Sequence, residues 1–303
     1  MYRQFQYAAR CTAFGLALMA IDQPAFGVDG VTEINQARAT AGGVTPSDSP
    51  GFPVTLDHPG SYRLTGNLVV TSENTTAIVI SSGNVTLDLN GFAIACNTGV
   101  APCGAGSGDG IDASGQANIA IVNGTVRDMG DSGIVTGVDA RIEGVRALGN
   151  HANGISTLHS SSLIGNTASD NGNDGLTAGV SSTIVNNTMR NNGRGGVETS
   201  TGCTIAGNTA NENTVFGIYC NGGCTIDHNT LDENGTGVSL LGGNNIVGNT
   251  ARNNANFALV CIGSDSGYSL NTFTGNNGGG DNAQVNGCTP MGSNFCGTNT
   301  ACP

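Results

Sequence analysis

Residues 196–216 read GVETSTGCTIAGNTANENTVF, and residues 217–236 read GIYCNGGCTIDHNTLDENGT. Both stretches begin with a glycine and an aliphatic residue, and both carry CTI and then NT at the same offsets from that glycine. A second asparagine follows in each, at Asn213 and Asn234. The agreement at so many offsets indicates an internal repeat of about 21 residues.

The same pattern extends outward in both directions. It restarts at intervals of 20 to 23 residues, at Gly110, Gly133, Gly154, Gly175, Gly196, Gly217, Gly237 and Ala258. Two aliphatic columns and two asparagine columns run in phase with these restarts. One asparagine column contains Asn166, Asn187, Asn208, Asn229, Asn249 and Asn271, and the other contains Asn150, Asn171, Asn192, Asn213, Asn234, Asn254 and Asn276.

A period of this length predicts identical units that stack and bury their apolar faces against one another. Within each unit, apolar and polar residues alternate over three short runs, which indicates strands. Asparagine and glycine suit the bends because both tolerate positive φ. Leucine-rich repeats have a similar period but need several leucines per unit, so we reject that alternative. The sequence therefore predicts an all-β parallel β-helix, a solenoid of about ten coils.

Four segments are expected. Arg3 and Arg10 followed by the apolar run of residues 11–21 favour a cleaved signal peptide. Thr32 to Ala41, followed by two glycines, reads as a short helix that covers the open end of the solenoid. The expected segments are a signal peptide at 1–27, an N-terminal cap at 28–51, the β-helix at 52–280 and a Cys-rich segment at 281–303.

The composition restricts the cellular compartment and the binding partners that are expected for the protein. Charged residues make up only 11% of the 303 residues, no lysine occurs, and the formal net charge is −12. Nucleic acid is an unexpected partner because its recognition needs a basic surface. No stretch after residue 27 is apolar enough for a membrane span. With nine cysteines left after cleavage, an oxidising compartment is expected, so the chain is predicted to be secreted or periplasmic.

The cysteine spacing favours local disulfides. Cys96 and Cys103 bracket a short loop, and Cys296 and Cys302 lie close together near the end of the chain. Cys203 and Cys224 occupy equivalent positions in adjacent coils, so they are expected to lie close enough for a disulfide. Cys220 with Cys224 is the competing pairing, and the sequence leaves both open.

The Gly-Ile restarts with their asparagine columns resemble the repeats of the pectate-lyase-like superfamily of right-handed parallel β-helices. PGSYRLTGNL (59–68) and NVTLDLNGFAI (84–94) are similar to the opening coils of uncharacterised secreted bacterial members of that superfamily. The resemblance covers most of residues 28–280 and implies the fold and a right-handed helix. It leaves activity open, because the superfamily includes lyases, hydrolases, epimerases, adhesins and proteins without known chemistry.

Enzymes of this superfamily use clustered carboxylates, or a basic residue with calcium-binding carboxylates. Stacking places equivalent positions side by side, and the residues two after each restart form an expected outward column. It brings together only Glu198 and Tyr219, with Arg194 nearby, and these three are the best-placed catalytic or sugar-binding candidates. The outward column reads Asp112, Val135, Ser156, Thr177, Glu198, Tyr219, Ser239 and Val260.

Metal binding has little support in the sequence. An acidic edge at Asp170, Glu212 and Glu233 is the only expected position for Ca²⁺, and its alternation with arginines is more simply explained by weak surface ion pairs. Some copper-maturation proteins resemble this fold, but neither the methionines nor the four histidines cluster here, so no cofactor is expected.

We therefore expect a β-helix module that binds polysaccharide or has a structural role at a surface, rather than an enzyme. The alternative is a polysaccharide lyase, hydrolase or epimerase acting on an acidic glycan.

Overall fold

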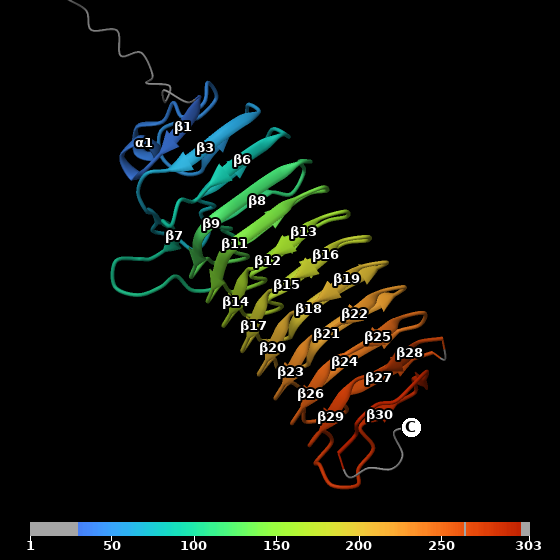
Figure 1. Cartoon of the computed structure of the whole chain (residues 1–303). Helices are drawn as coiled ribbons and strands as arrows, with labels where there is room; N and C mark the ends of the chain where they lie inside the picture. Colours follow the sequence, from blue (N-terminus) through green and yellow to red (C-terminus); the bar gives the residue numbers. More distant parts are fainter. Residues whose placement is uncertain (1–29, 264, 298–303) are drawn as a thin grey trace, which may run out of the picture.

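The computed structural model describes residues 30–263 and 265–297. The predicted signal peptide (1–27) and Cys302 lie outside the described residues. The chain winds into an elongated rod whose coils follow one another along the axis in sequence order (Figure 1). Every paired strand runs parallel to its neighbours in the coils before and after it, and one ladder alone has eleven strands, one per turn. The predicted parallel β-helix is confirmed.

Each regular coil contributes one strand to each of three ladders. The first two ladders form one 20-stranded sheet because β9 and β11 are long enough to belong to both. The first ladder consists of β1 (Val31–Ile34), β3 (Gly60–Leu64), β6 (Val85–Asp88), β9 (Ile119–Arg127), β11 (Arg141–Leu148), β13 (Ser162–Ile164), β16 (Thr183–Val185), β19 (Thr204–Ala206), β22 (Thr225–Asp227), β25 (Asn245–Val247), β28 (Gly267–Ser269) and β31 (Thr289–Pro290). The second consists of β4 (Leu68–Val70), β7 (Ala93–Cys96), parts of β9 and β11, β14 (Thr167–Ser169), β17 (Thr188–Arg190), β20 (Thr209–Asn211), β23 (Thr230–Asp232), β26 (Thr250–Arg252) and β29 (Thr272–Thr274).

The third ladder is the separate 11-stranded sheet and carries the candidate site. It consists of β2 (Val54–Leu56), β5 (Ile78–Ile80), β8 (Ile111–Ala113), β10 (Ile134–Thr136), β12 (Ile155–Thr157), β15 (Leu176–Ala178), β18 (Gly195–Thr201), β21 (Phe216–Gly222), β24 (Thr236–Leu241), β27 (Leu259–Ile262) and β30 (Val285–Asn286). The aliphatic residue after each restart is fully or almost fully buried here, as Val197, Ile218 and Val238 are.

Stacked aliphatic side chains fill the centre of the rod. Ile184, Ile205 and Ile226 are directly paired in consecutive strands of the first ladder, and all three are completely buried. Burying such a side chain contributes roughly 1.5–3 kcal/mol. Because each coil is too thin to bury its own apolar side, this stabilisation exists only when neighbouring coils are in register.

Both asparagine columns lie inside the rod at the bends between ladders and are almost completely buried. In Asn208, the backbone N–H and the side-chain amide both donate to Asn229 Oδ1, at 2.9 and 3.0 Å. The same amide donates to the Ile184 carbonyl at 2.9 Å, while Asn208 Oδ1 accepts two bonds from Asn187. The arrangement repeats along both columns, so the asparagines satisfy the buried polar groups of the bends.

The N-terminal cap begins with a strand. β1 pairs with β3, and the helix α1 spans only Gln36–Ala41, with the Asn35 side chain accepting from the Arg38 N–H at 3.0 Å. The prediction that the helix starts at Thr32 was wrong, because residues 31–34 continue the first ladder and Asn35 is the actual N-cap. The capping helix itself is confirmed.

Three disulfides link described residues. Cys96–Cys103 is confirmed, Cys220 pairs with Cys224, and Cys261 pairs with Cys288, a bond that the sequence did not suggest. Cys203 is left as a buried free thiol. It still lies one rung from Cys224, because the Thr225 N–H donates to the Cys203 carbonyl at 2.9 Å.

Replacing one ladder asparagine tests the bend network. Asn208→Ala removes the acceptor of two buried donors of Asn187, its backbone N–H and its side-chain amide, so we expect a loss of about 3 kcal/mol in the free energy of unfolding. Asn245→Ala, at an exposed strand position, is the matched control and should change stability little. Urea unfolding followed by circular dichroism measures both. Equal effects of the two substitutions would contradict a stabilising role for the ladder.

The geometry also predicts the outcome of removing Cys220. In Cys220→Ser, Cys203 and Cys224 remain on adjacent rungs, within the roughly 4.4–6.8 Å between Cα atoms that disulfides span. We expect a Cys203–Cys224 bond in protein isolated from an oxidising compartment, detected by mass spectrometry of an unreduced digest. Cys203→Ser, the control, should keep Cys220–Cys224. Two free thiols in Cys220→Ser would refute the expectation.

Candidate functional site

The outward column predicted for the third ladder is present. Direct strand pairing joins Thr177 to Glu198, Glu198 to Tyr219, and Tyr219 to Ser239. The remaining members pair in the same order, from Asp112 at one end to Val260 at the other. The outer surface of this ladder thus mixes small hydroxyl side chains with valines and one aspartate around a single Glu-Tyr pair.

A shallow hollow of about 290 Å³ lies on this surface, across β12, β15, β18 and the end of β21. Hydroxyl side chains dominate it, including Ser156, Thr177 and Ser200, and Glu198 and Asn221 close one side. The Thr177 hydroxyl donates to Ser156 Oγ at 2.8 Å, and the Tyr219 hydroxyl donates to Asn221 Oδ1 at 3.0 Å. The hollow therefore offers donors and acceptors at fixed positions, without a positive charge in its lining.

Arg194 joins two carboxylates beside this hollow. Its Nη1 lies 2.6 Å from Asp174 Oδ2, and its guanidinium forms two hydrogen bonds with Glu198, one of them at 3.1 Å. The guanidinium also lies over the Phe216 ring, 5.1 Å from its centroid. Both acidic partners and the ring hold this arginine in place, so it has little capacity left to bind an anionic ligand.

Gly195 explains how Phe216 reaches this position. A Cβ on Gly195 would come within 2.0 Å of the Phe216 ring, which means that the ring occupies the space beside the glycine. Phe216 in turn contacts Tyr219, with ring centroids 5.5 Å apart. Because Gly195 has no side chain, the ring of Phe216 from the next coil fits beside it and packs against the Arg194 guanidinium.

The two carboxyl groups have opposite pKa shifts. Burial, together with a hydrogen bond with the neighbouring Glu198, raises the pKa of Asp174 to about 6. The hydrogen bond from Arg194 lowers the pKa of Glu198. The Asp174 side chain is only 1% exposed, and its Oδ1 has no hydrogen-bond partner. Glu198, which is 30% exposed, is thus the ionised carboxylate that solvent reaches.

The structure brings Glu198, Tyr219 and Arg194 together as one cluster, but sequence reasoning missed Asp174 and Phe216. Both occupy the column immediately before the glycine restart, where Asp174, Gly195 and Phe216 follow one another in successive coils. Comparing the residues at that position from coil to coil would have shown an aspartate, a glycine and a phenylalanine in succession.

The acidic edge does not converge on a cation site. A notch of about 80 Å³ is lined by Asn211, Glu212, Asp232 and Glu233. Two of its three carboxylates already have partners, because Arg190 binds Glu212 at 3.0 Å and Arg252 binds Asp232 at 2.6 Å. These contacts are surface ion pairs, which contribute little stability.

Metal ligands are likewise dispersed in the described part of the chain. No group of three His, Cys, Asp or Glu residues in 30–263 and 265–297 is arranged to hold a metal ion. In the same residues, no helix is long and apolar enough to cross a membrane.

Solved structures with this fold include enzymes that modify polysaccharides. A threonine-to-asparagine mutant of the periplasmic alginate epimerase AlgG superposes with a TM-score of 0.56 at 15% identity, covering 80% of this chain and 77% of the epimerase. An aspartate-to-alanine mutant of the same epimerase gives a TM-score of 0.51 at 13% identity with the same coverage. At such low identity the likeness shows the fold alone. No curated protein matches the sequence.

A protein-family match covers residues 96–278, which is more than half of the chain and includes the hollow, the Arg194 cluster and most of the regular coils. The chain therefore belongs to the periplasmic copper-binding protein (NosD) family of β-helix proteins.

Proposed function

We propose that the protein is a non-catalytic β-helix module that binds a neutral polysaccharide along the third ladder. The observation that carries the proposal is the hydroxyl-lined hollow closed by Glu198 and Asn221. The ionised carboxylate accepts hydrogen bonds from sugar hydroxyls, and the amide of Asn221 can both accept and donate them. A shallow surface hollow leaves room for a chain longer than one sugar.

The charges favour a neutral chain over an acidic one. Arg194 is already bound to Asp174 and Glu198, and the whole protein carries a formal net charge of −12. A polymer of uronates would bring further negative charge to Glu198 without a free cation in the lining to compensate for it. For this reason the ligand we propose is a neutral polysaccharide and differs from alginate, the polymer named for the epimerases of similar fold.

Copper, which the family description names, does not fit the described residues. Copper in proteins is held by clustered imidazole, thiolate or thioether groups. The histidines are dispersed in separate contacts: His58 and His228 with the preceding aspartates, His151 with the Cys103 carbonyl and His159 with the Val180 N–H. We therefore assign no copper-dependent step to the part of the chain that the structure describes.

An enzymatic alternative is favoured by one observation, the opposite pKa shifts of Asp174 and Glu198. Paired carboxyl groups with separated pKa values are what general acid–base hydrolysis of glycosides needs. Here, however, the Asp174 side chain is buried and held by Arg194, so its carboxyl does not reach the hollow surface. For this reason we favour binding without turnover.

Binding is tested with affinity gels that contain neutral glucans, mannans or galactans, and with uronate polymers as the comparison. We expect retardation by at least one neutral polymer, and Glu198→Ala should weaken it about tenfold or more because a charged hydrogen-bond acceptor is lost. Asp112→Ala, in the same column but outside the hollow, is the matched control. Unretarded migration in every gel, or equal effects of the two substitutions, would refute the proposal.

Turnover is tested by incubating the same polymers, and uronates with and without Ca²⁺, with the protein and following new reducing ends and unsaturated sugar ends. We expect no product. Product formation that Glu198→Gln abolishes would replace the binding assignment with a catalytic one. Product formation that Glu198→Gln and Tyr219→Phe leave unchanged would place an activity elsewhere on the rod.

The raised pKa of Asp174 predicts a pH dependence of stability. The unfolded chain has the ordinary value of 3.8 and the folded protein about 6, so the folded state binds the proton more tightly. Stability from this group is therefore full below about pH 4 and declines as the pH rises through about 6. Unfolding midpoints should therefore fall between about pH 4 and 6.5 and level off above about pH 7, and the fall should be less steep in Asp174→Asn.

Asp109 provides the comparison, since burial raises its pKa to about 6 as well. Asp109→Asn should also flatten the profile, whereas Asp281→Asn, at an exposed position away from both carboxyl groups, should not. A wild-type midpoint that is constant across this range would contradict the shift.

A further inference from the structure

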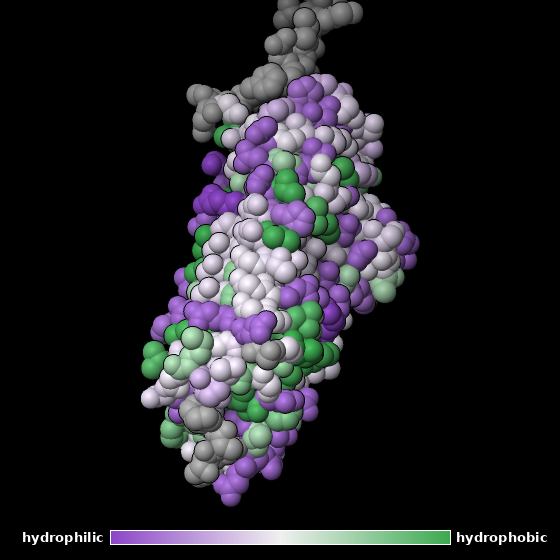
Figure 2. Space-filling view, turned by 90° about the vertical axis from the view of Figure 1, so that its right-hand side faces the viewer, coloured by the Kyte–Doolittle hydropathy of each residue, from purple (hydrophilic) through white to green (hydrophobic). Residues whose placement is uncertain are grey.

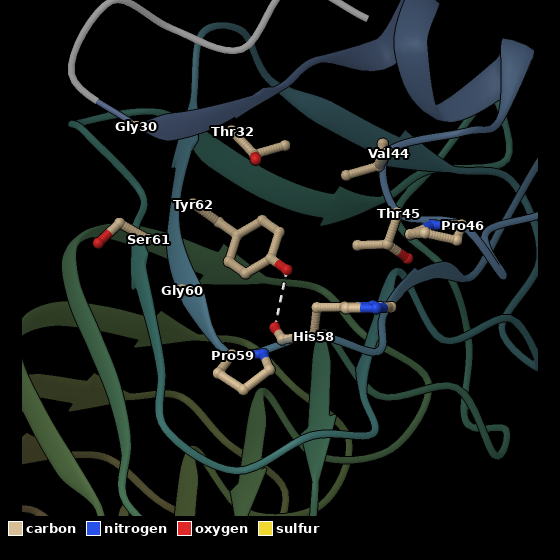
Figure 3. A pocket seen from close by; sticks show the side chains of 10 residues that line it. All are labelled: Gly30, Thr32, Val44, Thr45, Pro46, His58, Pro59, Gly60, Ser61 and Tyr62. Carbon is tan, nitrogen blue, oxygen red and sulfur yellow. Dashed lines mark hydrogen bonds between the residues drawn. The ribbon is translucent and has the colours of Figure 1, made fainter.

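A second hollow lies at the capped end of the rod, away from the third-ladder surface (Figure 3). Its volume is about 350 Å³, within the lower range of small-molecule sites. Strand β1, the start of β3 and the loop after α1 surround it. Figure 3 shows Tyr62 in the middle of this space, with Val44, Thr45 and Pro46 on one side and Pro59 and Ser61 on the other.

Hydrogen bonds fix the walls of this hollow without a ligand. The Tyr62 side chain is buried, and its hydroxyl donates to the His58 carbonyl at 2.8 Å. The Thr45 hydroxyl donates to the Thr55 carbonyl at 2.7 Å. The loop and the turn that face each other are therefore both anchored, so a ligand would enter a preformed site.

Asp57 orients the imidazole of His58 at the edge of the hollow. Asp57 Oδ1 lies 2.7 Å from His58 Nδ1, and the Ser47 hydroxyl donates to the other carboxylate oxygen. The hydrogen bond from Ser47, together with that of His58, keeps the pKa of Asp57 well below its usual range, so the group stays a carboxylate. A carboxylate on Nδ1 favours the tautomer with its proton there, which leaves Nε2 of the neutral ring as an acceptor.

The lining combines apolar surfaces with hydroxyl groups and excludes carboxylate and guanidinium groups. Val44, Pro46, Pro59 and the Tyr62 ring supply the apolar part, while Thr32 and Ser61 supply hydroxyls. A purely aromatic ligand would leave these hydroxyls and the His58 Nε2 without partners, at a cost in desolvation. A ring with both C–H faces and hydroxyl groups satisfies both parts of the lining.

We propose that this hollow is a second ligand site, which binds a single neutral sugar ring, and that His58 accepts a hydrogen bond from one of its hydroxyls. The site is independent of the proposed function, because it shares no residue with the third-ladder hollow.

The chain contains a matched control for His58. Asp227 and His228 form the same consecutive pair, with Oδ1 and Nδ1 2.5 Å apart, on the exposed surface of the first ladder. The His228 side chain is 73% exposed, and neither residue lines the capped-end hollow. Both histidines make the same contact with the preceding aspartate but only His58 lines the hollow, so a difference in sugar binding between their substitutions reports on the hollow.

The test is saturation-transfer NMR on the full protein with methyl glycosides of glucose, galactose and mannose and with N-acetylglucosamine. We expect binding of at least one sugar with a dissociation constant on the order of 1 mM. His58→Ala should weaken it about tenfold, and His228→Ala should not change it. Thr32→Phe, which fills the hollow from β1 because the Thr32 side chain points toward Val44 (Figure 3), should abolish it, whereas Glu198→Ala should have no effect.

Three results would overturn the proposal: no transfer to any sugar, equal affinity in wild type and Thr32→Phe, or binding of phenol or indole in preference to all the sugars. Thermal unfolding of each variant shows whether it is folded, and His58→Asn, which can still accept a hydrogen bond, should keep part of the affinity if the assigned role is right.

Discussion

Register between successive coils is the constraint on which the rest of this structure depends. Each buried asparagine donates its backbone N–H and its side-chain amide to the Oδ1 of the asparagine one coil later, so a shift of a single residue would break both columns at once. Apolar stacking alone tolerates sliding, because isoleucine packs against isoleucine in several ways. The asparagine columns therefore select one register, and Gln284 ends one column by accepting from Asn276.

Because the register is fixed, equivalent surface residues of successive coils stack into columns. A site forms where one coil has a different residue from its neighbours at the same position. The outward residues of the third ladder form one continuous column that mixes small hydroxyl, valine and charged side chains, and Gly195 lies in the same strand as Glu198 of that column. Because Gly195 has no side chain, Phe216 reaches back under Arg194, and Arg194 connects a buried acid to an exposed one. One glycine in a regular repeat thus accounts for the only Asp-Arg-Glu cluster found among the described residues.

The sequence predicted the contacts that recur in successive coils and missed the contacts that occur only once. The period alone placed Glu198 beside Tyr219 and the isoleucines on top of one another, because equivalent residues must stack. Asp174 belongs to the cluster because the long side chain of Arg194, in the next coil, extends to it. The repeat period does not predict such a contact between non-equivalent positions. Cys261 pairs with Cys288 across an irregular coil, and the capped-end hollow depends on how a loop folds over β1. The choice between two cysteine pairings was open because both satisfied the spacing.

The surface chemistry of the rod is consistent with ligands that carry hydroxyls rather than charge. Arg63, Arg127, Arg141, Arg190, Arg194 and Arg252 each bind a nearby carboxylate, so most of the few cations are already neutralised locally. The face drawn in Figure 2 consists largely of side chains of intermediate hydropathy, with separate hydrophilic and hydrophobic patches. Among residues 30–263 and 265–297, metal-ligating side chains are dispersed over several coils. A neutral glycan needs aligned hydroxyl, amide and carboxylate groups, such as those that line the third-ladder hollow.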